Sequence, residues 1–432
     1  MTSPPGGKAA LGLVIVLASL WSAGAPAGEP AADRSTWSSL VGQTSVGASL
    51  RGAYWSSSRD FDGRENLPVA ALWMHGRWDP DPAASLYVDG WVRNDDLFIA
   101  KETSGKFREG YLDLRLGALD VRLGRQIIAW GRADQINPTD NLTPRDFTLL
   151  VPEDADQRSG TTGARAIYRV AGLSLTGVVL PTFEPHVIPL QRPPENSTLR
   201  ERLPSDPVMQ GAFKVEQTGG RVDWSLSYFD GLDLFPDLGI DSLRPTGVDL
   251  LLRHHRIRVA GADAAAALGP YTVRGEVAYT FTEHERAGDQ IKSPFVFLVL
   301  GADRTLPGGL YVNIQYVMRV IAHFQDPFAV GDPTVRRVAI EQASINDQLD
   351  EAKHALAVRL SKTWLNETLV TEITSIISPA RAEFVLRPKV KYAVTDRLKL
   401  TAGADVFRGE TPSFFGRLRD TSTAYVEVRW DF

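Results

Sequence analysis

Arginine and lysine side chains are the groups in this chain with the most binding chemistry to offer. Many of them alternate with apolar residues and share one face of an extended segment with carboxylates. Rings of Arg and Lys in a water-filled passage favour anions; alternatively, charges of both signs could pair across strands and stabilise a wet wall. The basic residues expected to line such a passage are Arg93, Arg115, Arg122, Arg165, Arg319, Arg387, Lys389 and Lys391.

A second set of polar residues lies in the segment 132–160, which has no apolar period. Inside a pore, this segment would set the narrowest point and give it a mixed charge; the alternative is a loop that caps the outer surface. Irregular backbone is tolerated within a barrel because it lines water. A calcium site is not expected, since the carboxylates do not match a twelve-residue calcium loop. The constriction candidates are Asp134, Asn137, Asp140, Arg145 and Asp146.

Residue types that carry catalysis are sparse. The chain has no cysteine, and its seven histidines stand beside no G-x-S-x-G or H-E-x-x-H motif. Without these, nucleophilic and zinc chemistry lack support. Glycine motifs that bind phosphate are absent as well. We therefore expect no enzyme activity, no cofactor and no metal. The net charge of −5 gives no case for nucleic-acid binding.

Period-two alternation is the signal for the elements that must position these residues. In the last segment, Tyr425, Glu427, Arg429 and Asp431 face one way, and the opposite face holds Ala424, Val426, Val428, Trp430 and Phe432. Repeated segments of about ten residues, with charges confined to one face, are typical of strands that have lipid on one side and a wet lumen on the other.

Links of alternating length separate these segments. Short links carry turn residues, as at Gly117-Ala118 and Ala171-Gly172, and long links follow. We therefore predict an all-β fold: a transmembrane antiparallel up-and-down β-barrel of about 18 strands (16 is the alternative), with short periplasmic turns and long outer loops. The predicted strands are 44–56, 67–79, 84–94, 107–117, 119–131, 161–170, 172–183, 208–217, 221–230, 246–261, 270–282, 293–304, 309–322, 352–363, 366–378, 381–394, 397–408 and 419–432.

Arg125 is an exception to the rule that charges avoid the lipid face. A charge on the lipid face near mid-membrane costs roughly 2–4 kcal/mol, yet Arg125 is in phase with the apolar Leu123. Either a β-bulge at Gly124 shifts the phase, or Arg125 lies at the headgroup level, where it can snorkel.

The two ends of the chain carry targeting signals. Lys8, an apolar run from residue 9 to 20, and Ala25-Pro26-Ala27 predict a signal peptide cleaved after residue 27. Residues 28–43 would form a short periplasmic segment, and 44–432 the barrel. Trp430 and Phe432 end the alternating apolar face, and we expect the barrel-insertion machinery to read them as an insertion signal.

One local motif adds a family resemblance. Gly124-Arg125-Gln126, then Trp130-Gly131 and Asn137-Pro138, resembles the porin-like outer-membrane families of Gram-negative bacteria. These include poorly characterised barrels often associated with export of hydrophobic compounds and, more distantly, the alginate-export type. The resemblance implies a channel in the outer membrane, in contact with its lipid and lipopolysaccharide. The basic residues named above add the expectation that it passes small anionic solutes, and hydrophobic solutes are the other expectation. The alternative is a dedicated export barrel or a sheath that works with a periplasmic partner.

Overall fold

The computed structural model describes residues 43–57, 59, 63–97, 102–191, 193, 196–245, 247–283 and 291–432. The predicted leader 1–27 lies outside these residues, as does all of the predicted segment 28–43 except residue 43. Both remain predictions.

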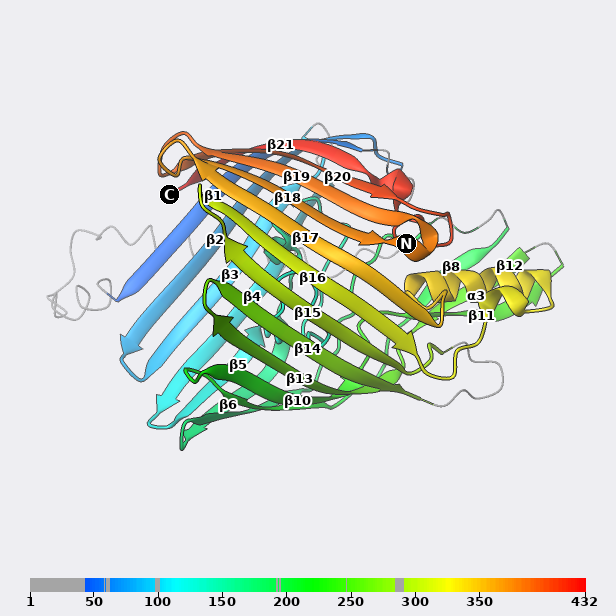
Figure 1. The fold of residues 1–432 in the computed structure, drawn as a ribbon, viewed down its shortest axis with the longest axis horizontal. Coiled ribbons are helices and arrows are strands. Elements are labelled where there is room, and N and C mark those ends of the chain that lie inside the picture. Colours follow the sequence, from blue (N-terminus) through cyan, green and yellow to red (C-terminus); the bar gives the residue numbers. More distant parts are fainter. Residues whose placement is uncertain are drawn as a thin grey trace, which may run out of the picture.

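A closed barrel of eighteen antiparallel strands makes up most of the molecule (Figure 1). Neighbouring strands follow chain order, and β1 pairs with β21 to close the ring. The predicted fold class and strand number are confirmed. The strands are β1 (Thr44–Ser57), β2 (Asn66–Asp81), β3 (Ala84–Asn94), β4 (Thr103–Leu116), β5 (Leu119–Gln126), β6 (Thr161–Val170), β7 (Leu173–Leu180), β9 (Gln210–Gln217), β10 (Val222–Leu232), β13 (Arg256–Leu268), β14 (Tyr271–Thr282), β15 (Phe295–Thr305), β16 (Leu310–Ile321), β17 (Ala352–Trp364), β18 (Leu369–Ser378), β19 (Glu383–Ala393), β20 (Leu398–Arg408) and β21 (Thr423–Asp431).

The alternation in the sequence corresponds to the two faces of this wall. On β21, Val426, Val428 and Trp430 are exposed outward, whereas Tyr425 and Glu427 are buried toward the lumen. A continuous outer belt of exposed apolar side chains suits hydrocarbon, in which closure of the barrel also leaves no unpaired strand edge.

Aromatic residues on the outer face gather beside the short links. Tyr168, Tyr271, Trp364, Tyr392 and Trp430 are all exposed and lie near the strand ends that these links join. Tyr and Trp favour membrane interfaces because their rings are apolar and their tips are polar. The short links themselves are tight turns: Ala171 and Gly172 have φ of 51° and 80°, the left-handed pair that a two-residue hairpin favours.

One predicted strand, 246–261, is wrong as a single element. The chain breaks at His254-His255, and the barrel strand β13 begins only at Arg256. The preceding β12 (Gly247–Arg253) instead pairs with β11 (Asp237–Arg244) and runs parallel to β8 (Thr198–Arg202) in a separate three-stranded sheet. Period two fits both strands equally well, and of the two partners of β12 only β11 is its neighbour in the sequence, whereas β8 lies about 50 residues earlier.

Helix α3 (Pro333–Ile345) packs against this small sheet beyond one rim of the barrel (Figure 1). Asp332 caps its first turn by accepting hydrogen bonds from the N–H groups of Thr334 and Val335, and Pro333 takes the first helical position. The short 3-10 turns are η2 (Asp154–Gln157), η3 (Pro327–Ala329), η4 (Pro379–Arg381) and η5 (Arg419–Thr421). None of the described helices is long and apolar enough to cross a membrane.

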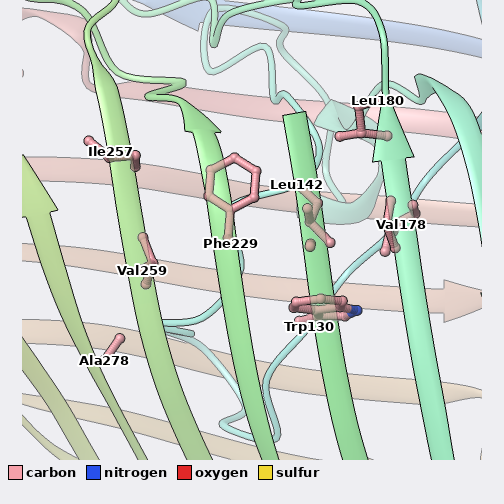
Figure 2. Packing of buried hydrophobic residues seen from close by; sticks show 10 residues of the cluster. Trp130, Leu142, Val178, Leu180, Phe229, Ile257, Val259 and Ala278 are labelled. Carbon is pink, nitrogen blue, oxygen red and sulfur yellow. The ribbon is translucent and has the colours of Figure 1, made fainter. Parts of the chain in front are cut away.

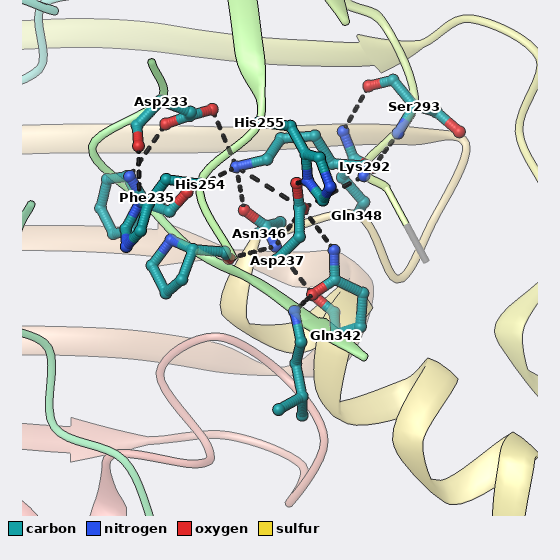
Figure 3. Close-up of polar contacts among 12 residues, drawn as sticks. Asp233, Phe235, Asp237, His254, His255, Lys292, Ser293, Gln342, Asn346 and Gln348 are labelled. Atoms are coloured by element: carbon teal, nitrogen blue, oxygen red, sulfur yellow. Dashed lines mark hydrogen bonds and ion pairs between the residues drawn. The ribbon is translucent and has the colours of Figure 1, made fainter. Parts of the chain in front are cut away.

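A buried polar cluster ties together three long links at this rim (Figure 3). The Lys292 ammonium donates to Asn346 Oδ1 at 2.5 Å, and the Asp237 carboxylate accepts from Gln342 Nε2 at 2.5 Å and pairs with His255 Nδ1 at 2.8 Å. Burial raises the pKa of Asp237, but Lys292 and His255 lower it more, so the pKa stays below its ordinary value. Each buried charge thus has partners, which a cluster of this kind requires.

Candidate functional site: the loop inside the barrel

The link between β5 and β6, residues 127–160, is called the lumen loop below. Its first half packs on the inner wall of β7, β10 and β13: Trp130 and Leu142 form one apolar cluster with the buried Val178, Phe229 and Val259 (Figure 2). These three wall residues are buried, whereas their neighbours in the strands are more exposed on the outer belt. Their side chains therefore face inward. The lumen loop therefore lies in the bore rather than over the outer surface.

Glu276 of β14 anchors this first half. It is only 2% exposed, and its carboxylate accepts hydrogen bonds from the N–H and hydroxyl of Thr139, both at 2.8 Å, and from the N–H groups of Arg132 and Ala133 at 3.1 and 3.3 Å. Gly131 lets the backbone turn here with φ of 99°, and a Cβ at this position would lie 2.7 Å from both Glu276 oxygens. Glycine is required by both the dihedral angle and the space.

The lumen loop then spans the bore. Arg132 pairs with Asp263 of β13 at 2.5 Å, and Asp134 pairs with Arg359 of β17 at 3.2 Å. The N–H of Gln135 donates to the side chain of Gln315 on β16 at 3.4 Å.

The second half binds the opposite wall through acidic side chains around η2. Asp154 pairs with Arg387 at 2.7 Å, and Glu153 lies 3.4 Å from Lys389 and 2.6 Å from Lys391, all on β19. A further ion pair joins the lumen loop to β1, where Asp156 lies 2.6 Å from Arg51. Apolar contacts reinforce this side, since Leu150 packs against the stacked pair Trp55 and Tyr425.

A cavity of about 650 Å³ remains between the lumen loop and the inner wall of β17 to β21. Residues of several outer links also border it, including Ile188, Phe235, Ile345 and Phe415. Its lining combines charged and aromatic side chains. Seven side chains are basic and five are acidic. The aromatic residues of the lining are Trp55, Phe147, Phe235, Phe407, Phe414, Phe415 and Tyr425.

A smaller cavity of about 220 Å³ lies on the other side of residues 148–150, toward β2 and β3. Arg93 and Asp146 line it. Residues 148–150 of the lumen loop thus border both cavities.

Most of the basic residues expected in the lumen have acidic partners. Arg122 pairs with Asp113 at 2.6 Å, Arg319 lies 3.6 Å from Asp347, and Arg93 pairs with Asp95. The three on β19 bind the lumen loop as described. Arg115 donates to the Pro82 carbonyl at 2.9 Å, and Arg165 has no ion pair within the described part of the chain. The wall is therefore largely charge-balanced.

The five candidates of the lumen loop separate into two groups. Asp134, Asn137 and Arg145 line the larger cavity. Asp140 instead holds the loop together by pairing with Arg145 at 3.2 Å and with Arg158. Asp146 closes a turn, where it accepts from the N–H and hydroxyl of Thr148 at 2.9 and 2.6 Å.

Several cavity residues were missed at the sequence level. Arg359 bridges Asp134 and Glu372, and Phe414 and Phe415 enter the cavity from the link 409–422. The N–H of Phe415 donates to Glu383 of β19 at 2.8 Å, which fixes that link against the wall. Two adjacent phenylalanines in a glycine-containing link were the available signal, because exposed rings in a loop are unfavourable in water.

His186, in the link 181–209, is packed against the lumen loop. Its Nδ1 accepts from the N–H of Arg145 at 2.9 Å, and its ring makes edge contacts with Phe147 and Phe235. Burial, together with the cationic Arg145 and Arg158, lowers the pKa of His186 from 6.5 to about 3. The imidazole is therefore neutral at physiological pH.

The register around Arg125 shows no bulge at Gly124 in either the β4–β5 or the β5–β6 pairing; the irregularity lies one strand earlier, between β3 and β4. Arg125 sits at the end of β5 and binds Glu184 of the link 181–209, with Nη2 2.7 Å from Oε2. Burial raises the pKa of Glu184, but Arg125 and Lys106 lower it more, so the pKa lies below its ordinary value. An ion pair at the rim thus accommodates this charge.

Within the described residues, no group of three or more His, Cys, Asp or Glu side chains could hold a metal ion.

Comparison with known proteins rests on structure alone, since neither a protein-family model nor a curated protein matches the sequence. Solved structures that match include the outer membrane protein OpdK and OccK10 (OpdN) of Pseudomonas aeruginosa, and OccAB1 of Acinetobacter baumannii. Their identities to this chain are 12%, 14% and 9%, with TM-scores of 0.54, 0.53 and 0.54. Each match covers 90% of this chain and 98%, 99% and 96% of the other. The barrel therefore has the fold of Gram-negative outer-membrane porins.

Proposed function

We propose that this protein is an outer-membrane channel through which small solutes pass, and that the lumen loop sets its bore. The observation that carries the proposal is the cavity of about 650 Å³ beside the lumen loop, inside a closed barrel whose outer face is apolar. The lumen loop is bound to the barrel wall at Glu276 on one side and at Arg387 on the other, so it is held in place without filling the lumen.

The preferred solutes are small amphipathic anions. Seven basic against five acidic side chains give the cavity a modest positive excess, and Phe407, Phe414 and Phe415 offer an apolar surface. Rings of Arg and Lys attract anions in pores, whereas apolar groups of a solute gain from contact with the phenylalanines. Because most of these charges are paired, the preference for anions is weak.

A dedicated export barrel or a sheath would need the bore for its cargo or partner. The chain's own loop occupies that space, which favours a channel.

Kinship to alginate-export barrels stays a prediction, as do the cleaved leader and the reading of Trp430 and Phe432 by the insertion machinery. The geometry of the C-terminal strand supports recognition by the insertion machinery. The side chains of Trp430 and Phe432 are exposed outward, and the N–H of Phe432 donates to the Ala48 carbonyl at 2.9 Å.

Single-channel recording tests the proposal. The refolded protein in a planar bilayer should show a stable unit conductance, and its reversal potential in a KCl gradient should have the sign of a weak preference for chloride. Absence of conductance from protein that is verifiably folded and inserted would overturn the channel, and a cation-selective potential would overturn only the preference for anions.

A further inference from the structure

Two arginines face the lipid at the long-link end of β13. Arg256 and Arg258 flank the lumen-facing Ile257, so both point outward. Both share one carboxylate, that of Asp230 on β10, which pairs with Arg256 and lies 3.6 Å from Arg258. The Arg258 side chain is 63% exposed. Glu283, just past the end of β14, forms no ion pair with either guanidinium among the described residues, so Asp230 is the one carboxylate that pairs with them in this part of the structure.

Aromatic rings lie directly below these guanidiniums. The strand register places Asp230 and Phe281 on either side of Arg258, and Tyr228 and Tyr279 on either side of the next outward residue, Ala260. Tyr228 and Phe281 are exposed, and the rings of Tyr279 and Phe281 are 4.4 Å apart. Such rings are typical of the headgroup level of a membrane.

A floor of small side chains continues from this point toward the short links, along the outward face of β13. Larger outward residues flank part of it: Leu226 of β10 and Val277 of β14 lie on either side of Ala262. The floor spans roughly 20 Å along the strand, at about 3.3 Å per residue. Its residues are Ala260, Ala262, Ala264 and Ala266.

We propose that this surface binds one phosphorylated lipid of the outer leaflet, of the lipid A type. The phosphate would lie on Arg256 and Arg258, because the planar guanidinium matches phosphate geometry and is only weakly hydrated. An acyl chain would lie on the alanine floor. The two guanidiniums, of which that of Arg258 is largely exposed, select an anionic headgroup, and the position at the long-link end selects the outer leaflet. The proposal rests on the outer-membrane placement above, but not on channel activity.

Native mass spectrometry of the folded protein in detergent tests this, with bisphosphorylated lipid A and its dephosphorylated form as probes. We expect the protein to retain bisphosphorylated lipid A at least tenfold more strongly than the dephosphorylated lipid. The double variant R256Q/R258Q should lose that preference, and A262F, which places a large ring on the alanine floor, should weaken binding of both lipids.

Arg408→Gln is the matched control, because Arg408 is also exposed and outward at the long-link end, on β20, where Phe407 faces the cavity. It should bind as the unaltered protein does. Equal retention of both lipids, or unchanged retention by R256Q/R258Q, would overturn the proposal. Conductance is recorded in parallel: a conducting protein without lipid preference refutes only this site, and a lipid-binding protein without conductance refutes only the channel.

Discussion

Glu276 and Thr139, 137 residues apart in the sequence, are joined by two hydrogen bonds of 2.8 Å to the same carboxylate oxygen. One comes from the backbone and one from the hydroxyl of Thr139. This contact, buried inside the barrel, fixes the lumen loop to β14.

Replacing Glu276 with Gln should release the first half of the lumen loop. The amide NH₂ would face N–H donors, and each donor left unpaired costs about 1–3 kcal/mol. We expect a lower unfolding midpoint in urea and a larger, noisier unit conductance. Glu283→Gln is the control, since Glu283 is exposed at the end of the same strand. Conductance equal to that of the unaltered protein would show that Glu276 does not hold the loop.

Replacing Gly131 with Ala should destabilise the loop through both the dihedral angle and a clash. The left-handed conformation costs roughly 1–2 kcal/mol for a residue with a Cβ, and the contact with Glu276 adds on the order of 1–3 kcal/mol. Gly117→Ala separates the two effects, because Gly117 has φ of 67° with no atom near its Cβ position. Equal losses of stability in the two variants would contradict the clash.

Neutralising Glu153 and Asp154 together, as E153Q/D154N, should make the channel more selective for anions. The variant leaves Arg387, Lys389 and Lys391 without their partners on the lumen loop. Reversal potentials in a KCl gradient measure the shift, and conductance should rise because the loop loses three contacts. Asp206→Asn, at an exposed position in the link 181–209, should change neither quantity. A shift toward cations would refute the role assigned to this pairing.

Acidification should loosen the contact between His186 and the lumen loop. Because the folded-state pKa of about 3 lies below the ordinary 6.5, this stabilising contribution is complete above pH 6.5 and is lost progressively as the pH falls toward 3. We expect channel noise to increase over that window. His186→Phe should remove the dependence, and His323→Asn, at an exposed position, should retain it. Identical pH profiles for the unaltered protein and H186F would exclude His186 as the cause.

The sequence determined the barrel, because a wall between lipid and water imposes a local rule on every strand. Period two, short links of two to four residues and a terminal aromatic are all properties of neighbouring residues. Two predicted strands were wrong. The segment 246–261 breaks where β12 obeys the same period but pairs with β8 and β11. The segment 119–131 is a strand only as far as Gln126, after which residues 127–131 begin the lumen loop. The start of α3 was not predicted, although Asp332-Pro333 is a typical helix start in the sequence.

The functional site depended on the tertiary structure. The sequence placed Arg387 and Lys389 on the inner face, yet their partners Asp154 and Glu153 are more than 230 residues away, and no local pattern joins them. Whether the lumen loop entered the bore or capped it was equally open. Glu276 and Gly131 decided it, through a buried carboxylate whose hydrogen bonds can form only when the two segments meet. Local alternation therefore specifies which side of a wall a residue faces, whereas only closure of the barrel specifies what lies opposite.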